Sequence, residues 1–164
     1  MLSKSVAETE KIAREFAANI RPHASHAAHA TVIALSGDLG SGKTTFTKAF
    51  AAVLGIPDEE ITSPTFVIMK SYELGPRRRS NLSPDPRFDL GEQAANFKCF
   101  IHIDAYRLEK AQEIEKLGWS ELLGDPSNLI LIEWPENIGA ALPKDAQKIC
   151  FKFIDEGTRE IDFK

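Results

Sequence analysis

The chain has 164 residues, of which 43% are hydrophobic and 27% are charged, and these values fit one globular domain with a real core. Its formal net charge of −4 excludes a protein that binds nucleic acid through its overall electrostatic field. No apolar run approaches the roughly 18 residues of a membrane span, and the N-terminal residues form no apolar signal segment. Cys99 and Cys150 lie in strand-like runs and indicate a reducing compartment without a disulfide. We therefore expect a cytoplasmic protein without a membrane partner.

The first predicted element is a helix from about Ser5 to Ile20. Ser5 and Glu8 form a capping-box pattern at its start, and Ile12, Phe16 and Ile20 follow at helical spacing. An Arg-Pro pair at residues 21–22 ends the pattern.

The next segment, GDLGSGKT at residues 37–44, fits the phosphate-binding pattern G-x-x-x-x-G-K-[ST]. It lies between a predicted buried strand at residues 31–36 and a predicted helix at residues 43–54, which is the context the motif requires. Glycines let successive N–H groups form a concave anion site, and the helix start adds its positive dipole end. Lys43 should then reach the β- and γ-phosphates and the Thr44 hydroxyl should ligate Mg²⁺. The motif predicts nucleoside triphosphate binding, in preference to a glycine-rich turn that only caps a helix.

Further along, the patterns predict strands at residues 66–72, 99–104 and 128–133, and a helical stretch at 110–123 that is broken near Gly118. Two weakly alternating runs, 147–154 and 158–163, predict a C-terminal antiparallel hairpin. Residues 75–97 contain prolines, glycines and many charges without a period, and are interpreted as an inserted exposed loop. We predict one α/β domain over residues 1–164, P-loop NTPase-like, with a mixed, mainly parallel central sheet and helices on both faces.

Two acids, Asp104 and Glu133, each close a predicted apolar strand. Ligands of such sheets bind beyond the carboxyl ends of the strands, where an acid is the expected second ligand of Mg²⁺. Each acid could instead cap the next element, but two of them beside a phosphate loop favour metal binding.

The order and spacing of these motifs resemble the TsaE family, also called YjeE, over nearly the whole chain. Besides the phosphate loop with Thr45 and Phe46, the shared motifs are Ser63-Pro64-Thr65-Phe66, His102-x-Asp104-x-Tyr106-Arg107-Leu108 and Glu133-Trp134-Pro135. The family consists of small bacterial P-loop ATPases that act, with the proteins TsaD and TsaB, in the threonylcarbamoyl modification of adenosine 37 in tRNA. The resemblance implies an ATPase of this machinery that does not itself transfer the threonylcarbamoyl group and meets tRNA indirectly.

The resemblance also implies roles for individual residues. Lys43, Thr65 and Asp104 would be catalytic, with Thr65 sensing the γ-phosphate and metal and Asp104 acting on the attacking water. Thr44, Glu133 and Asp104 would hold Mg²⁺. The residues implied to bind ATP are Thr9, Asp38, Leu39, Gly40, Ser41, Gly42, Lys43, Thr44, Thr45 and Trp134.

The chain departs from the family at residues 75–97, where the family has a much shorter turn. Arg77-Arg78-Arg79 lies in this segment; a solvated lineage-specific loop is favoured over a contact with tRNA or a partner. Two other functions remain open. A small-molecule or nucleoside kinase would need an arginine-bearing lid, and the only arginine cluster lies in the inserted segment. A GTP-dependent switch would be expected to carry N-K-x-D, which does not occur.

Overall fold

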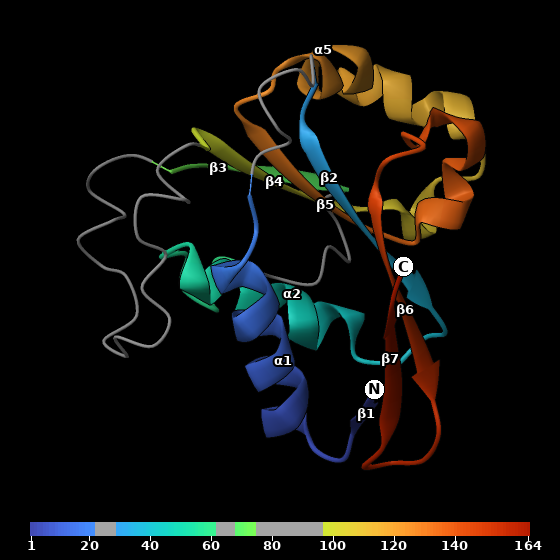
Figure 1. The fold of residues 1–164 in the computed structure, drawn as a ribbon. Coiled ribbons are helices and arrows are strands. Elements are labelled where there is room, and N and C mark those ends of the chain that lie inside the picture. The colour runs from blue at the N-terminus through green and yellow to red at the C-terminus, as the bar shows by residue number, and fades with distance from the viewer. Residues whose placement is uncertain (22–28, 62–67, 75–96) are drawn as a thin grey trace.

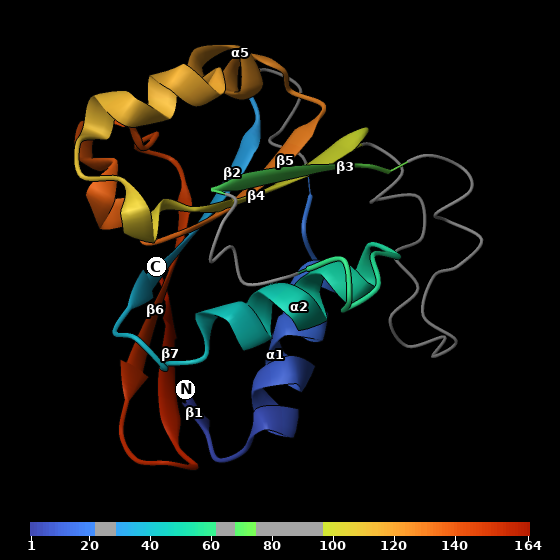
Figure 2. The same ribbon diagram turned by 180° about the vertical axis from the view of Figure 1, so that it is seen from behind.

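The computed structural model describes residues 1–21, 29–61, 68–74 and 97–164, and within these ranges it forms one sheet of seven strands covered by helices on both faces (Figures 1 and 2). The strands are β1 (Leu2–Ser3), β2 (Thr31–Gly37), β3 (Met69–Glu73), β4 (Cys99–Asp104), β5 (Asn128–Glu133), β6 (Gln147–Phe153) and β7 (Arg159–Phe163). The α-helices are α1 (Val6–Ala18), α2 (Lys43–Val53) and α5 (Trp119–Gly124), and the 3-10 helices are η2 (Ala105–Arg107), η3 (Ala111–Leu117), η4 (Pro135–Asn137) and η5 (Gly139–Ala141).

The sheet has the order β1-β7-β6-β2-β5-β4-β3, and its four central strands are parallel. The outer pairs β1–β7, β7–β6 and β3–β4 are antiparallel. The predicted mixed α/β sheet is therefore confirmed. Its register aligns Leu35 of β2 with Glu133 of β5, and Glu133 with Asp104 of β4, so the two acids end neighbouring strands beside the loop that follows β2.

Helix α1 begins where the sequence predicts. The Ser5 side chain caps it by accepting the N–H of Glu8 at 3.1 Å, while the Glu8 carboxylate accepts the N–H of Lys4 at 2.6 Å. In a standard capping box the Glu8 carboxylate would accept the N–H of Ser5, whereas here it accepts the N–H of Lys4, one residue upstream.

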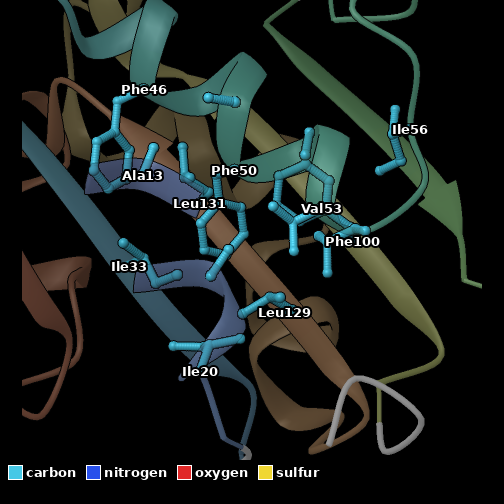
Figure 3. Close-up of a cluster of buried hydrophobic side chains, with 14 of the residues drawn as sticks. Ala13, Ile20, Ile33, Phe46, Phe50, Val53, Ile56, Phe100, Leu129 and Leu131 are labelled. Atoms are coloured by element: carbon cyan, nitrogen blue, oxygen red, sulfur yellow. The ribbon is translucent and has the colours of Figure 1, made fainter. Parts of the chain in front are cut away.

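Helices α1 and α2 pack together over one face of the sheet (Figures 1 and 2). Phe46 and Phe50 of α2 point into a core that Ile33, Leu129 and Leu131 share from the strands below (Figure 3). Both phenylalanines are fully buried, and burial of each stabilises the fold by about 1.5–3 kcal/mol.

The opposite face of the sheet is covered by η3, α5 and the 3-10 turns after β5. Ile130 and Ile132 alternate with the residues that face α2, and they pack with Ile114 and Trp119 in this second core. Gly118, with φ +75°, separates η3 from α5 and accounts for the predicted break in this helical stretch. Apolar cores on both faces explain why the central strands read as continuous apolar runs.

The predicted C-terminal hairpin is also confirmed, but it is not an appendage. Its first strand, β6, extends the parallel sheet by pairing with β2, and β7 pairs with the short strand β1. The hairpin therefore runs beside the phosphate loop. This position could not be read from the weak alternation of the two strands.

Several predictions lie outside the described residues, including the Ser63–Phe66 motif with Thr65 and most of the segment 75–97. Phe97, the last residue of that predicted loop, is fully buried in the core under α2. Within the described ranges no helix combines the length and apolar character that a membrane span requires.

Candidate nucleotide-binding site

The phosphate loop joins the carboxyl end of β2 to the start of α2, as its sequence context predicts. Gly37, Gly40 and Gly42 have φ values of +137°, +74° and +100°, which residues with a Cβ rarely adopt. Gly42 is the N-cap of α2 and makes no side-chain cap, so the first N–H groups of the helix remain directed at the loop. These donors and the helix dipole make an anion site.

The Lys43 side chain crosses back over this loop. Its ammonium donates to the carbonyls of Gly37 at 2.6 Å and Asp38 at 2.9 Å, and it lies 3.9 Å from the centroid of the Trp134 ring. Burial lowers the pKa of Lys43 below its ordinary value, and the nearby acids, Glu133 first among them, oppose this shift. The ammonium retains a third N–H with which it can reach a phosphate oxygen.

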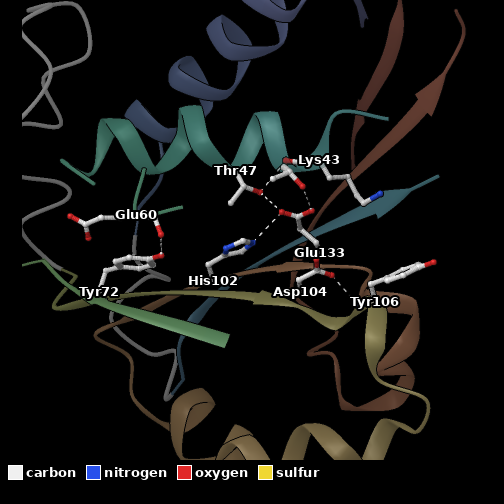
Figure 4. Close-up of polar contacts among 9 residues, drawn as sticks. Lys43, Thr47, Glu60, Tyr72, His102, Asp104, Tyr106 and Glu133 are labelled. Carbon is white, nitrogen blue, oxygen red and sulfur yellow. Dashed lines mark hydrogen bonds and ion pairs between the residues drawn. The ribbon is translucent and has the colours of Figure 1, made fainter. Parts of the chain in front are cut away.

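Glu133 is the centre of a buried polar network (Figure 4). One carboxylate oxygen accepts the Thr44 hydroxyl at 3.0 Å, and the other lies 2.8 Å from the Thr47 hydroxyl and 3.1 Å from His102 Nε2. Burial favours the neutral acid, but the hydrogen bond and charge of His102 and the two threonine hydroxyls outweigh it, and the pKa of Glu133 is lowered. The network therefore holds an ionised carboxylate beside Thr44.

Asp104 lies next to this carboxylate, at the end of the neighbouring strand. It is half-buried, and its Oδ1 accepts the N–H of Tyr106 at 3.0 Å. Burial raises the pKa of Asp104 above its ordinary value; the Tyr106 hydrogen bond opposes this shift, and the charge of Glu133 adds to it. Two neighbouring acids thus have pKa values displaced in opposite directions, an arrangement that recurs where one acid binds and the other exchanges a proton.

Trp134 directly follows Glu133 in a left-handed conformation, with φ +59°. Its backbone N–H donates to the Leu35 carbonyl at 3.1 Å, which extends the β2–β5 pairing by one residue. Its ring packs against Tyr106, with centroids 5.0 Å apart, and receives the Lys43 ammonium on its face. A left-handed tryptophan is uncommon, and such conformations gather at functional sites.

These side chains surround one cavity of about 390 Å³, a size typical of ligand sites. Its lining includes the predicted residues Thr9, Leu39, Gly40, Ser41, Gly42, Lys43, Thr44, Thr45, Asp104, Glu133 and Trp134. The structure thus brings these residues together around one cavity, and their roles there stay predictions. Asp38 contributes its carbonyl to Lys43, but its side chain is exposed outside the lining. Thr65 lies outside the described residues.

Thr9 is buried, and its hydroxyl is engaged by Ser3 Oγ at 2.8 Å and the Ser5 carbonyl at 3.3 Å. Its methyl group faces the loop instead and lies 3.9 Å from the point where a Cβ would stand if Gly42 had a side chain. Thr9 therefore presents an apolar surface to the cavity.

Thr47, Arg159 and Val6 belong to the site but were not predicted from the sequence. Thr47 follows Lys43 by one helical turn, so the helical period could have placed it on the same inner face. Arg159 lines the cavity from β7, and no local signal reveals this because the strand order brings it there.

The residues fit a nucleotide phosphate group and a divalent metal. Among the described residues, the Ser41 hydroxyl is the buried side-chain polar atom left without a hydrogen-bond partner, and it lies in the loop. The described chain holds no cluster of three or more His, Cys, Asp or Glu side chains suited to a metal alone. The Glu133 carboxylate beside the Thr44 hydroxyl suits Mg²⁺, because Mg²⁺ usually combines one or two carboxylates with substrate phosphates.

Fold and site together define a protein of the P-loop NTPase-like class. The model of the family described as "Threonylcarbamoyl adenosine biosynthesis protein TsaE" matches residues 3–161, and the chain belongs to this family. It is 36% identical over 156 residues to the "tRNA threonylcarbamoyladenosine biosynthesis protein TsaE" of Bacillus subtilis, covering 95% of this chain and 78% of that protein. The protein of the same name from Borreliella burgdorferi is 37% identical over 127 residues, covering 77% and 76% of the two chains. The crystal structure of Bacillus subtilis YdiB superposes with a TM-score of 0.65 at 31% identity, covering 99% of this chain and 82% of that one.

Proposed function

We propose that this protein binds and hydrolyses Mg-ATP as a component of the machinery that makes N6-threonylcarbamoyladenosine in tRNA. The observation that carries the proposal is the convergence of the phosphate loop, Lys43, Thr44 and two strand-end acids on one cavity. Membership of the TsaE family supports the link to tRNA modification.

The loop and Lys43 supply the phosphate site. Backbone N–H groups at the start of α2 would point at bound phosphates, and Lys43, held over the loop, would place a positive charge beside them. These donors stabilise the charge that develops on the transferred phosphoryl group.

Thr44 and Glu133 would hold Mg²⁺, with Asp104 beside them. The ion would supply positive charge that offsets the phosphate oxygens. His102 and Thr47 hold the Glu133 carboxylate by hydrogen bonds, which would fix its orientation toward the ion.

Asp104 is the proposed base that orients or deprotonates the attacking water. Its raised pKa makes it a better proton acceptor than an exposed aspartate, and its position at the end of β4 faces the same cavity. Asp104→Asn should lower turnover by about 10²-fold or more while measurable ATP binding remains. Unchanged turnover in this variant would exclude Asp104 as the base.

We further propose that TsaD and TsaB are the partners and that they complete the catalytic site. The test is Mg-ATP hydrolysis by the protein alone and with TsaD and TsaB, with Lys43→Ala as the control. Stimulation by the partners that disappears in Lys43→Ala supports the proposal. Equal and negligible turnover in both conditions contradicts the partner assignment, and phosphate transfer to an added acceptor would then be assayed to test the kinase alternative.

A further inference from the structure

Arg159 lines the cavity from the side opposite the acids. In the sheet order β7-β6-β2-β5-β4, the phosphate loop follows β2, Glu133 and Asp104 end β5 and β4, and Arg159 begins β7 on the other flank. The metal and the γ-phosphate belong beside the acids. A nucleotide lying along the loop therefore directs its nucleoside end toward Arg159 and the start of α1.

The Arg159 side chain lies against the loop. A Cβ built on Gly42 would be 3.7 Å from Arg159 Nε and 3.8 Å from its Cδ. Its Nη2 donates to the Gly40 carbonyl at 3.5 Å, which joins the hairpin to the phosphate loop. The arginine is thus part of the cavity wall.

The edge of the guanidinium is occupied by neutral acceptors. Nη1 lies 3.3 Å from the Asp155 carbonyl and 2.9 Å from the Glu156 carbonyl. Within the described chain no carboxylate forms a close ion pair with Arg159, although the Asp155 carboxylate lies near enough to feel its charge, so carbonyls fix the orientation of the cation. Three carbonyls thus engage the two Nη atoms, which leaves the Nε–H and the planar face of the group to meet a ligand.

Apolar groups also lie beside Arg159. Its guanidinium lies over the Phe153 ring, with Cζ 5.5 Å from the centroid. Val6, which is 62% exposed at the start of α1, and the methyl group of Thr9 line the same cavity. This combination of a flat cation and small apolar groups suits a planar aromatic ring better than a phosphate.

We propose that Arg159 is the base-stacking residue of the nucleotide site, packing its guanidinium face on the nucleobase while the phosphate loop holds the triphosphate. The inference rests on the proposed ATP site and adds to it the residue that distinguishes a nucleotide from a bare polyphosphate. Because every base has a π face, the contact should strengthen binding of ATP and GTP alike.

The test compares two ligands, Mg-ATP and Mg-tripolyphosphate, by calorimetric titration of wild type, Arg159→Ala and Arg159→Lys. Arg159→Ala should weaken ATP binding about fivefold to tenfold and leave tripolyphosphate binding unchanged. Arg159→Lys should behave like Arg159→Ala, since lysine keeps the charge but has no plane. Lys152→Ala is the matched control, because it removes a charge from the same hairpin at a side chain that is outside the cavity lining.

Three outcomes would overturn the inference. Equal losses for both ligands would mean that Arg159 acts on the phosphates or on the loop. Full rescue by Arg159→Lys would mean that charge alone matters, and unchanged ATP affinity in Arg159→Ala would mean that the base lies elsewhere. A wild-type chain that binds neither ligand would instead contradict the proposed function, so the two failures are distinguishable.

Discussion

Gly37, at the junction of β2 and the phosphate loop, should be the least replaceable glycine of the site. A Cβ at this position would lie 2.2 Å from the backbone carbonyl oxygen of Phe151, on the adjacent strand β6. Carbon and oxygen atoms normally stay about 3.3 Å apart, so β2 and β6 would have to separate by about 1 Å. The obstacle is backbone, which no change of rotamer relieves.

The cost of Gly37→Ala has two parts. A residue with a Cβ at a positive φ costs about 1–2 kcal/mol, and overpacking of this kind costs about 1–3 kcal/mol more. A total of about 2–5 kcal/mol is a large part of the 5–15 kcal/mol that stabilises a typical domain. For a chain of this size it corresponds to a fall in Tm of roughly 10 °C.

Gly40→Ala is the matched comparison for this substitution. Gly40 also has a positive φ, of +74°, but no atom lies within 4 Å of an added Cβ. Its replacement should cost only the conformational part, about 1 kcal/mol. Thermal and urea unfolding of both variants would measure the difference, and a loss in Gly37→Ala no larger than that in Gly40→Ala would refute the close approach of β2 and β6.

Three further predictions concern the cavity. Ser41→Ala should raise the free energy of unfolding of the nucleotide-free protein by about 1 kcal/mol, because it removes a buried hydroxyl without a hydrogen-bond partner. The same variant should bind ATP more weakly in calorimetry. A lower free energy of unfolding would contradict the first expectation. The hydrogen bonds of Glu133 outweigh its burial and lower its pKa in the folded protein. Its ionisation therefore stabilises the metal-free fold at pH values above its ordinary pKa of 4.5. This stabilisation is lost as the pH falls through the pKa that Glu133 has in the folded protein. Acid unfolding of Glu133→Gln should lack this loss, and an identical pH profile would argue against the network. Trp134→Phe should abolish any change in tryptophan fluorescence on addition of Mg-ATP. Trp134 lies against the Lys43 ammonium, whereas Trp119 is buried on the other face of the sheet. A fluorescence change that persists in this variant would place the nucleotide away from Trp134.

Local patterns predicted the parts of the site that local chemistry determines. The glycine spacing before Lys43 specifies the loop, because only such a backbone turns its N–H groups inward at the start of a helix. Asp104 and Glu133 were predicted beside the phosphate loop because parallel strands end at the same edge of a sheet, and the structure shows that their strands are neighbours. Both inferences depend on residues close in sequence or on one rule of sheet geometry.

The remaining features depend on which strands become neighbours. Arg159 reaches the loop only because β6 joins β2 and carries β7 with it. The pairing of β1 with β7 involves two residues of β1, too few for any alternation to be seen. Trp134 could be predicted near the nucleotide only through the family resemblance, since a lone tryptophan after a strand is ordinarily a core residue.

The pairing of β1 with β7 has a consequence for how the protein is made. β1 finds its partner in β7, far along the chain, and long-range pairings of this kind form slowly because a long chain segment must first be closed. Val6 and Thr9 follow β1 directly, while Arg159 begins β7, so opposite walls of one cavity come from segments that are distant in sequence. A nascent chain that already contains the entire phosphate loop should therefore have an incomplete cavity until β7 has been released. Full nucleotide affinity should thus follow the pairing of β7 with β6 and β1.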